Sequence, residues 1–152
     1  MRVKMDISSS ELSQFDFACM AVMRNIGAGT KKATIAACEE ILDMSRAQVP
    51  KDTWTMLSSA FYEVKRRSDV AGYSYQGIVG YGGNGDPVNP KTGKRASSYM
   101  VKLHEDMSAP HVNGKAKFLE DPVREYAEGK FYRTIFQYAA EAIAASNAMN
   151  AR

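Results

Sequence analysis

Cysteine and histidine are scarce in this 152-residue chain, which contains only two of each. Cys19 and Cys38 form neither a CxxC motif nor a cysteine-histidine group, so we expect two reduced thiols in the protein core. Two histidines are too few for a three-histidine metal site. No segment approaches the roughly 20 consecutive apolar residues that a membrane span needs. The sequence therefore predicts a protein without a disulfide framework or a membrane segment, made in the cytoplasm.

Strong charge of one sign is also missing. The 20 basic and 17 acidic residues give a formal net charge of +3, which does not by itself indicate a nucleic-acid-binding protein. The proportions of hydrophobic residues, 45%, and charged residues, 24%, are ordinary for a soluble globular protein. The length suits one domain better than two. We therefore expect a single domain over residues 1–152, with segments at 1–50, 51–118 and 119–147.

The first segment contains one alternating run and two helical patterns. Residues 2–7 alternate apolar and polar side chains, which is typical of a half-buried strand. Apolar residues then recur at helical spacing over 9–26 and again over 31–48, separated by Gly27-Ala28-Gly29. This pattern predicts an antiparallel helical hairpin in which Cys19 faces Cys38, with both helices on the same side of a sheet.

The remaining segments predict strands followed by a helix. Residues 54–64 and 70–81 are rich in aromatic and β-branched residues and are separated by the polar turn 65–69. Residues 98–104 fit either a strand or a helical turn. Asp121 and Pro122 are typical of a helix start, and the helix over 119–147 has an apolar face too wide for one neighbour. The expected fold is α+β: an antiparallel sheet of three to four strands with helices packed on one face and a long C-terminal helix.

No motif supplies a complete catalytic or cofactor site. Gly80, Gly82 and Gly85 match the spacing of a dinucleotide-binding loop, but a proline-rich loop follows them instead of the helix that this motif requires. His104, Glu105, Asp106 and His111 are the only plausible metal cluster, and nothing in their spacing fixes a third ligand. Such residues more often anchor a loop through hydrogen bonds to nearby backbone. We therefore expect a protein that is not an enzyme and holds no cofactor or metal.

The loop over residues 82–98 is the remaining candidate for a binding element. Its glycines and prolines disfavour regular structure, and loops of this length are often functional. Lys91, Lys94 and Arg95 face only Asp86 in the local sequence. The loop is either a basic finger that docks on an acidic neighbour or on DNA phosphates, or a solvated hairpin tip.

Two stretches carry a resemblance to a known family. The first stretch runs from Tyr99 to Pro122 and contains Tyr99, His104, Glu105, Asp106, His111, Asn113, Gly114, Lys115, Lys117, Phe118, Leu119, Glu120 and Pro122. The second contains Val49, Pro50, Lys51, Asp52 and Thr53, then Leu57, Ser58 and Ser59, with Trp54 where a glycine is usual. In these residues the chain resembles the tail-completion and neck proteins of tailed bacteriophages, over about residues 33–142.

The resemblance implies a structural virion protein of the neck or tail, assembled in the host cytoplasm. It implies a homo-oligomeric ring of six or twelve copies around the DNA channel, in contact with connector or stopper and tail-tube proteins and without sequence-specific DNA binding. A ring requires a heterologous interface that closes. The residues expected at assembly contacts are Lys91, Lys94, Arg95, Lys115, Lys117, Tyr132 and Phe136. The alternative is a monomeric nucleic-acid-binding domain that uses the basic loop 82–98.

Overall fold

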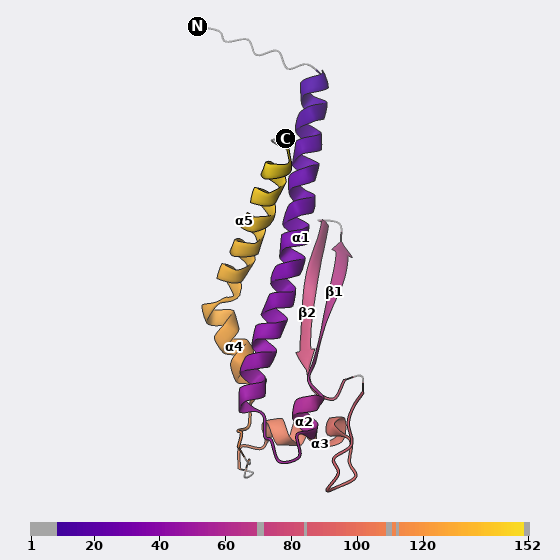
Figure 1. Ribbon diagram of the computed structural model, residues 1–152, viewed down its shortest axis with the longest axis vertical. Helices are drawn as coiled ribbons and strands as arrows, with labels where there is room; N and C mark the ends of the chain where they lie inside the picture. Colours follow the sequence, from indigo (N-terminus) through magenta and orange to yellow (C-terminus); the bar gives the residue numbers. More distant parts are fainter. Residues whose placement is uncertain (1–8, 70–71, 84, 109–110, 112, 151–152) are drawn as a thin grey trace.

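The computed structural model describes residues 9–69, 72–83, 85–108, 111 and 113–150. In chain order the elements are α1 (Ser9–Gln48), α2 (Thr55–Ser58), β1 (Phe61–Asp69), β2 (Gly72–Gly80), α3 (Ala96–Glu105), α4 (Glu120–Gly129) and α5 (Phe131–Asn150). The molecule is elongated: α1 runs through its length, and the short helices α2 and α3 gather with the loops at one end (Figure 1). We call that end the base and define it as the described residues of 49–60 and 81–119.

Helix α1 is continuous over 40 residues, so the predicted hairpin of helices 9–26 and 31–48 is wrong. Gly29 lies inside α1 at a point where another helix approaches closely. A Cβ on Gly29 would lie 2.6 Å from the carbonyl oxygen of Tyr138 in α5. The Thr30 hydroxyl donates to the Ile26 carbonyl at 2.8 Å, within the helix, and caps nothing.

This continuity also corrects the placement of the two cysteines. Cys19 and Cys38 lie on one helix, about 28 Å apart along its axis, and do not face each other. Both are free thiols. Cys38 is buried, and this burial raises the pKa of its thiol. The predicted core position is confirmed for Cys38, whereas Cys19 is only half-buried, and the prediction that the two thiols face each other is wrong.

Among the described residues the sheet has two antiparallel strands, not the predicted three to four. The strand predicted over 54–64 begins later, because Trp54 has a left-handed backbone (φ 59°) and leads into α2. The residues predicted as a polar turn, 65–69, belong to β1, since charged side chains are tolerated on an exposed strand. Residues 98–104 lie within helix α3. The strand predicted over 2–7 lies outside the described residues.

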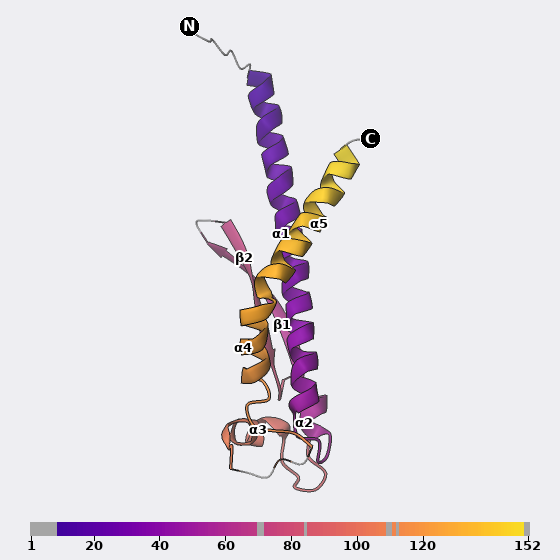
Figure 2. The same ribbon diagram turned by 90° about the vertical axis from the view of Figure 1, so that its left-hand side faces the viewer.

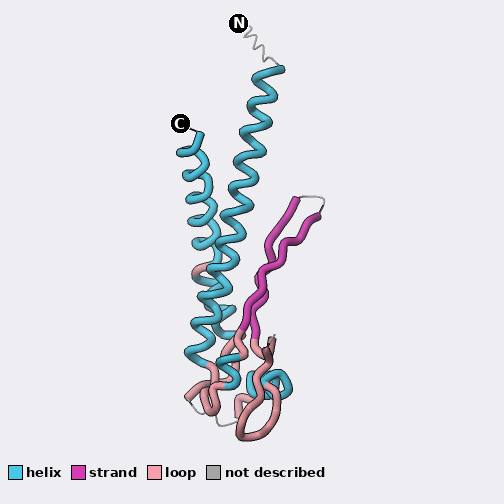
Figure 3. Tube along the Cα trace, turned by 45° about the vertical axis from the view of Figure 1, so that its right-hand side comes forward, coloured by secondary structure: helices cyan, strands magenta, loops and turns pink. Residues whose placement is uncertain are grey.

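The β1–β2 hairpin rises from the base as an arm beside α1 (Figure 3). Its register pairs Tyr62 with Val79 and Val64 with Gly77, so these side chains share the face that packs on α1. The Tyr62 hydroxyl donates to Glu39 of α1 at 2.9 Å. Gly77 is required by close approach, because a Cβ there would lie 2.5 Å from Cys38 Sγ. Helix α1 therefore covers one face of the hairpin, while α4 and α5 pack on α1.

A small hydrophobic core holds the loops and short helices of the base together. Val49, Met56, Tyr81 and Phe118 are almost fully buried against one another. The rings of Tyr81 and Phe118 meet edge to face at 5.3 Å, and the Tyr81 hydroxyl forms a 2.7 Å hydrogen bond with buried Ser45. The sequence predicts that Phe118 and Leu119 anchor the last helix in the core. This is confirmed for Phe118, while Leu119 is only half-buried at the edge of this core.

The predicted C-terminal helix over 119–147 consists of two helices, α4 and α5, with a break at Lys130. Gly129 weakens helix propensity at this point, and nothing lies within 4 Å of where its Cβ would be. The break redirects α5 so that it crosses α1 near Gly29 and then diverges from it (Figure 2). Tyr126 bridges the break, because its hydroxyl donates to Thr134 at 2.9 Å.

Candidate assembly surfaces

The predicted basic residues of loop 82–98 lie at the base, and contacts with other residues hold their loop in place. The Lys91 ammonium contacts Asp52 at 2.5 Å, although 39 residues separate the two in sequence. Asp86 accepts hydrogen bonds from the hydroxyl and the backbone N–H of Ser97, and the hydroxyl lowers the pKa of its carboxyl group. A bridge between Val88 and Arg95 closes the loop into a tight hairpin. The described part of the loop therefore projects as a closed hairpin in which Lys91, Lys94 and Arg95 are exposed, and residues 96–98 belong to α3 and not to the loop.

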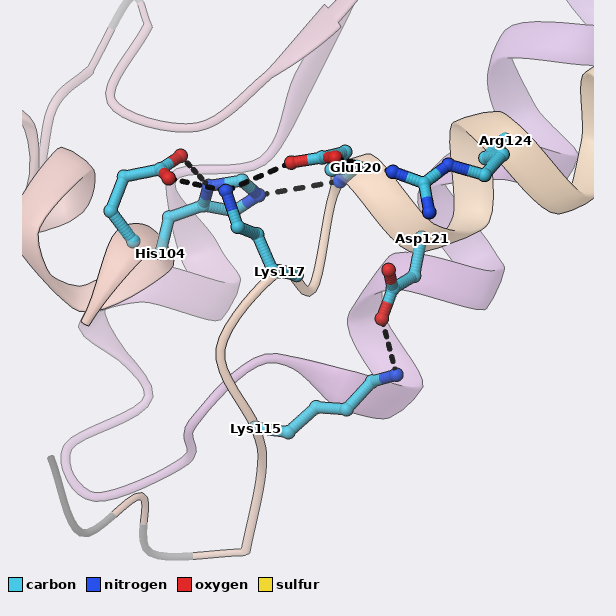
Figure 4. Close-up of polar contacts among 7 residues, drawn as sticks. His104, Lys115, Lys117, Glu120, Asp121 and Arg124 are labelled. Carbon is cyan, nitrogen blue, oxygen red and sulfur yellow. Dashed lines mark hydrogen bonds and ion pairs between the residues drawn. The ribbon is translucent and has the colours of Figure 1, made fainter. Parts of the chain in front are cut away.

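Lys115 and Lys117 belong to a network of ion pairs at the start of α4 (Figure 4). Lys117 contacts Glu105 and also Glu120, the latter at 2.9 Å, and Lys115 contacts Asp121 at 2.6 Å. Hydrogen bonds from Lys117 lower the pKa of Glu105 and of Glu120. Each lysine is thus compensated by carboxylates of its own chain, which favours a structural role over a role as a free cation.

His104 completes this network and orients the chain before α4. Its Nδ1 lies 2.7 Å from a carboxylate oxygen of Glu105, and its Nε2 accepts the backbone N–H of Glu120 at 3.3 Å. Because Nε2 accepts, the neutral ring carries its proton on Nδ1 and donates it to Glu105. The ring also stacks edge to face on Phe118 at 4.9 Å.

The candidate metal cluster does not converge. His104 and Glu105 lie together, but Lys117 occupies the same carboxylate, and Nε2 of His111 bonds the backbone carbonyl of Asp106. No group of three or more potential ligands is present among the residues that the structure describes. Nδ1 of His111 and Oε1 of Gln48 are buried without a hydrogen-bond partner. The hypothesis of a loop anchored by hydrogen bonds describes these residues better than a ligand set does.

The predicted contact residues Tyr132 and Phe136 are uncovered on α5. Each is 70% exposed, and their spacing of four residues places them on one stripe of the helix. The ring of Phe131, in the preceding position, meets the ring of Tyr132 edge to face at 5.4 Å. A stripe of large exposed side chains on one helix is a typical contact surface.

A second apolar stripe lies on the N-terminal part of α1, where the sequence pattern had indicated core. Phe17 is 67% exposed and Met23 is 61% exposed, with Met20 between them. Val22 and Ile26, which belong to the apolar pattern over 9–26, are exposed as well. The periodicity was read correctly as a helix with an apolar stripe, but this part of α1 projects beyond the hairpin and α4, so little of the chain is there to cover it (Figure 1).

An apolar groove of about 250 Å³ lies between α1, β2, α4 and α5. We call it the β2 groove. Three residues of β2 and none of β1 line it. Sequence reasoning missed this groove because it forms only where four separate elements meet. Its lining residues are Thr30, Ala33, Thr34, Ala37, Cys38, Ile41, Tyr75, Gly77, Val79, Val123, Tyr126, Phe131, Thr134 and Ile135.

Comparisons with known proteins do not assign the chain to a family. No family model, no curated protein and no solved structure matches the chain. Within the described ranges, none of the helices has the length and apolar character needed to cross a membrane.

Proposed function

We propose that the chain is a structural protein of a tailed-bacteriophage virion. Its copies form a ring of six or twelve around the DNA channel at the junction of head and tail. There the ring completes the tail, or joins it to the connector or stopper of the filled head and to the tail tube. It encircles DNA without reading its sequence, and it performs no catalysis.

The observation that carries this proposal is the amount of apolar surface left uncovered on one chain. The stripe at Phe17 and Met23 on α1 and the stripe at Tyr132 and Phe136 on α5 lie on different helices. Monomeric soluble proteins rarely expose several such patches, which more often mark contact sites. A subunit with separate contact surfaces can bind one neighbour on each side, which is the requirement of a ring.

The resemblance to tail-completion and neck proteins supports the viral setting, and its two stretches meet in space. A Cβ on Gly114 would lie 2.6 Å from the Cα of Pro50. Just beside this contact, the Lys115 N–H donates to the carbonyl of Gln48 at 2.9 Å. Phe118 and Val49, one from each stretch, belong to the same buried core. The residues that carry the resemblance thus lie together in the base.

A monomeric nucleic-acid-binding domain is the alternative. It relies on loop 82–98, with Lys115 and Lys117 nearby. Lys91, Lys115 and Lys117 each contact a carboxylate of the same chain, which reduces the positive potential available to phosphates. This arrangement counts against the alternative.

Light scattering of the purified protein over a range of concentrations, with electron microscopy of the largest species, tests the proposal. We expect discrete closed rings and only weak binding to free duplex DNA. The alternative predicts a monomer at all concentrations, whose DNA affinity falls by several powers of ten between about 50 and 200 mM salt if many phosphates are contacted. A monomer with strong, salt-sensitive DNA binding would overturn the ring proposal.

A further inference from the structure

The free edge of β2 lacks the features that normally protect a sheet edge. In the described part of the chain β2 pairs with β1 on one side and with no strand on the other. The sequence of β1 contains five charged residues, whereas the nine residues of β2 contain none. Proteins commonly use charged side chains, lysine above all, to prevent pairing at an exposed edge. By this criterion β1 is protected and β2 is open to a further strand.

The β2 groove provides a place for side chains of such a strand. Tyr75, Gly77 and Val79 form its wall on the sheet side, and Val123, Phe131 and Ile135 form its wall on the side of α4 and α5. A strand added to β2 would point every second side chain into this apolar groove and the others toward solvent. The added strand should therefore alternate apolar and polar residues.

Residues 2–7 have this pattern. Val3, Met5 and Ile7 alternate with three charged residues, and the segment lies outside the described residues, next to the start of α1. Six residues span about 20 Å as a strand, and the nine residues of β2 span about 30 Å. The segment is therefore short enough to pair along its whole length with β2.

The segment cannot reach the middle of β2 on its own chain. Gly77 packs against Thr34 of α1, which follows Ser9 by 25 residues, or about 37 Å of helix. Residues 1–8 span at most about 28 Å when fully extended from Ser9. A strand that lies beside Gly77 and fills the β2 groove must therefore belong to another copy.

We propose that residues 2–7 of one copy add as a strand to the free edge of β2 in the next copy, with Val3, Met5 and Ile7 in the β2 groove. The inference rests on the self-association proposed above and names the contact that produces it. Donor and acceptor are different surfaces of the same chain, so the contact is heterologous and repeats from copy to copy until it closes. Backbone hydrogen bonds supply affinity, and the apolar side chains set the register.

Cross-linking between two differently tagged full-length copies tests the contact. Both carry Cys19→Ser and Cys38→Ala; one also carries Lys4→Cys, and the other carries Ser74→Cys or Gln76→Cys. The matched controls are Arg67→Cys and Lys65→Cys, which lie opposite Ser74 and Gln76 on β1. A strand beside β2 would be two strand spacings, about 10 Å, from β1, too far for a disulfide. We expect doubly tagged cross-linked product from the β2 cysteines and background levels from the β1 cysteines.

Substitution within the segment provides the second measurement. Val3→Ser, Met5→Ser and Ile7→Ser together should abolish the oligomer in light scattering, because the groove loses its apolar occupants. Arg2→Ser, Lys4→Ser and Asp6→Ser together change as many residues of the same segment and should leave the oligomer in place. Circular dichroism should show the same helix content in both variants, because the changed residues precede the first described helix.

The outcomes separate this inference from the proposed function. Rings that persist in the Val3/Met5/Ile7 variant, or equal cross-linking to β1 and β2, would overturn the strand contact while leaving the ring proposal standing. A wild-type protein that remains monomeric and forms no cross-link would overturn both. Loss of rings in both triple variants would show that the alternating pattern does not matter, and the strand contact would again be wrong.

Discussion

The buried ring of Phe118 meets the rings of Tyr81 and His104 edge to face and so joins separate segments of the base. Phe118→Ala should lower the free energy of unfolding by about 3–5 kcal/mol, because the ring is only 1% exposed and its removal leaves a cavity in the core of the base. Phe136→Ala, at a position that is 70% exposed, should change it by no more than about 0.5 kcal/mol. Urea denaturation of the two variants checks both values, and equal stability would show that the base contributes no cooperative core.

Two glycines should respond to alanine in opposite directions. In Gly29→Ala the new Cβ would approach the Tyr138 carbonyl and the Cα of Ala139, which are backbone atoms that cannot move aside. The resulting overpacking, about 1–3 kcal/mol, should exceed the gain of roughly 1 kcal/mol in helix propensity. Gly129→Ala meets nothing within 4 Å and should stabilise the protein by about 0.5–1 kcal/mol. Thermal melts that rise for both variants would contradict the close crossing of α1 and α5.

Lys117 should control how stability depends on pH. Its hydrogen bonds lower the pKa of Glu105 and Glu120 below 4.5, and these carboxylates raise the pKa of Lys117 above 10.5. The stabilisation that Glu105 and Glu120 contribute is present above about pH 4.5 and is lost as the pH falls through their lowered pKa. The stabilisation that the Lys117 ammonium contributes is lost as the pH rises through its raised pKa. The difference between wild type and Lys117→Met in urea unfolding should therefore be largest between about pH 5 and 10. If the difference in unfolding free energy between wild type and variant does not change with pH, the effect of Lys117 comes from packing and not from its ion pairs.

For single residues, the sequence predicted the burial of Phe118 better than it predicted which side chains form ion pairs. Phe118 stands among apolar neighbours before a helix start, and that local context is enough to indicate an anchor. The contact between Lys91 and Asp52 spans 39 residues and depends on how two loops meet, so no local pattern reveals it. The basic loop therefore looked less compensated in sequence than it is in the structure.

Among the elements, α1 shows most clearly where local signals fail. Gly27-Ala28-Gly29 is typical of a helix end, but an isolated glycine also suits the crossing of two helices at short distance, and only the position of α5 decides between them. The hairpin strands were predicted in the right region, yet their ends shifted because β1 tolerates Lys65, Arg66 and Arg67 in an exposed strand. Residues 2–7 supply the alternating pattern of a further strand, which lies outside the described residues.

The exposed stripe on α5 predicts that this helix takes part in self-association. Tyr132→Ser together with Phe136→Ser should weaken self-association while leaving the melting temperature nearly unchanged, because both side chains are exposed in the single chain. Ala140→Ser together with Ala144→Ser, at exposed positions of the same helix, is the matched control. Sedimentation velocity over a range of concentrations measures the effect. Unchanged association would mean that this stripe faces solvent in the assembly.

For the whole molecule, loop 82–98 remains the expected contact with a neighbouring ring or connector. Lys91→Ser, Lys94→Ser and Arg95→Ser together should alter stability by no more than about 1 kcal/mol, since the contact of Lys91 with Asp52 is an exposed ion pair. They should still impair docking, so that infected cells accumulate DNA-filled heads and separate tails. Electron microscopy of lysates, with yields of infectious particles, checks this outcome. Normal yields would identify the loop as a solvated tip.

The continuity of α1 also makes the molecule sensitive to the number of residues in that helix. Each added residue turns everything before it by about 100° and raises it by about 1.5 Å. One extra alanine between Ser9 and Gly29 would thus rotate the N-terminal end away from its neighbour with almost no change in height, whereas seven extra residues would restore the angle to within about 20° and lift that end by roughly 10 Å. The length of α1 therefore sets the distance between its two ends, and its helical rotation sets the direction in which the N-terminal end faces.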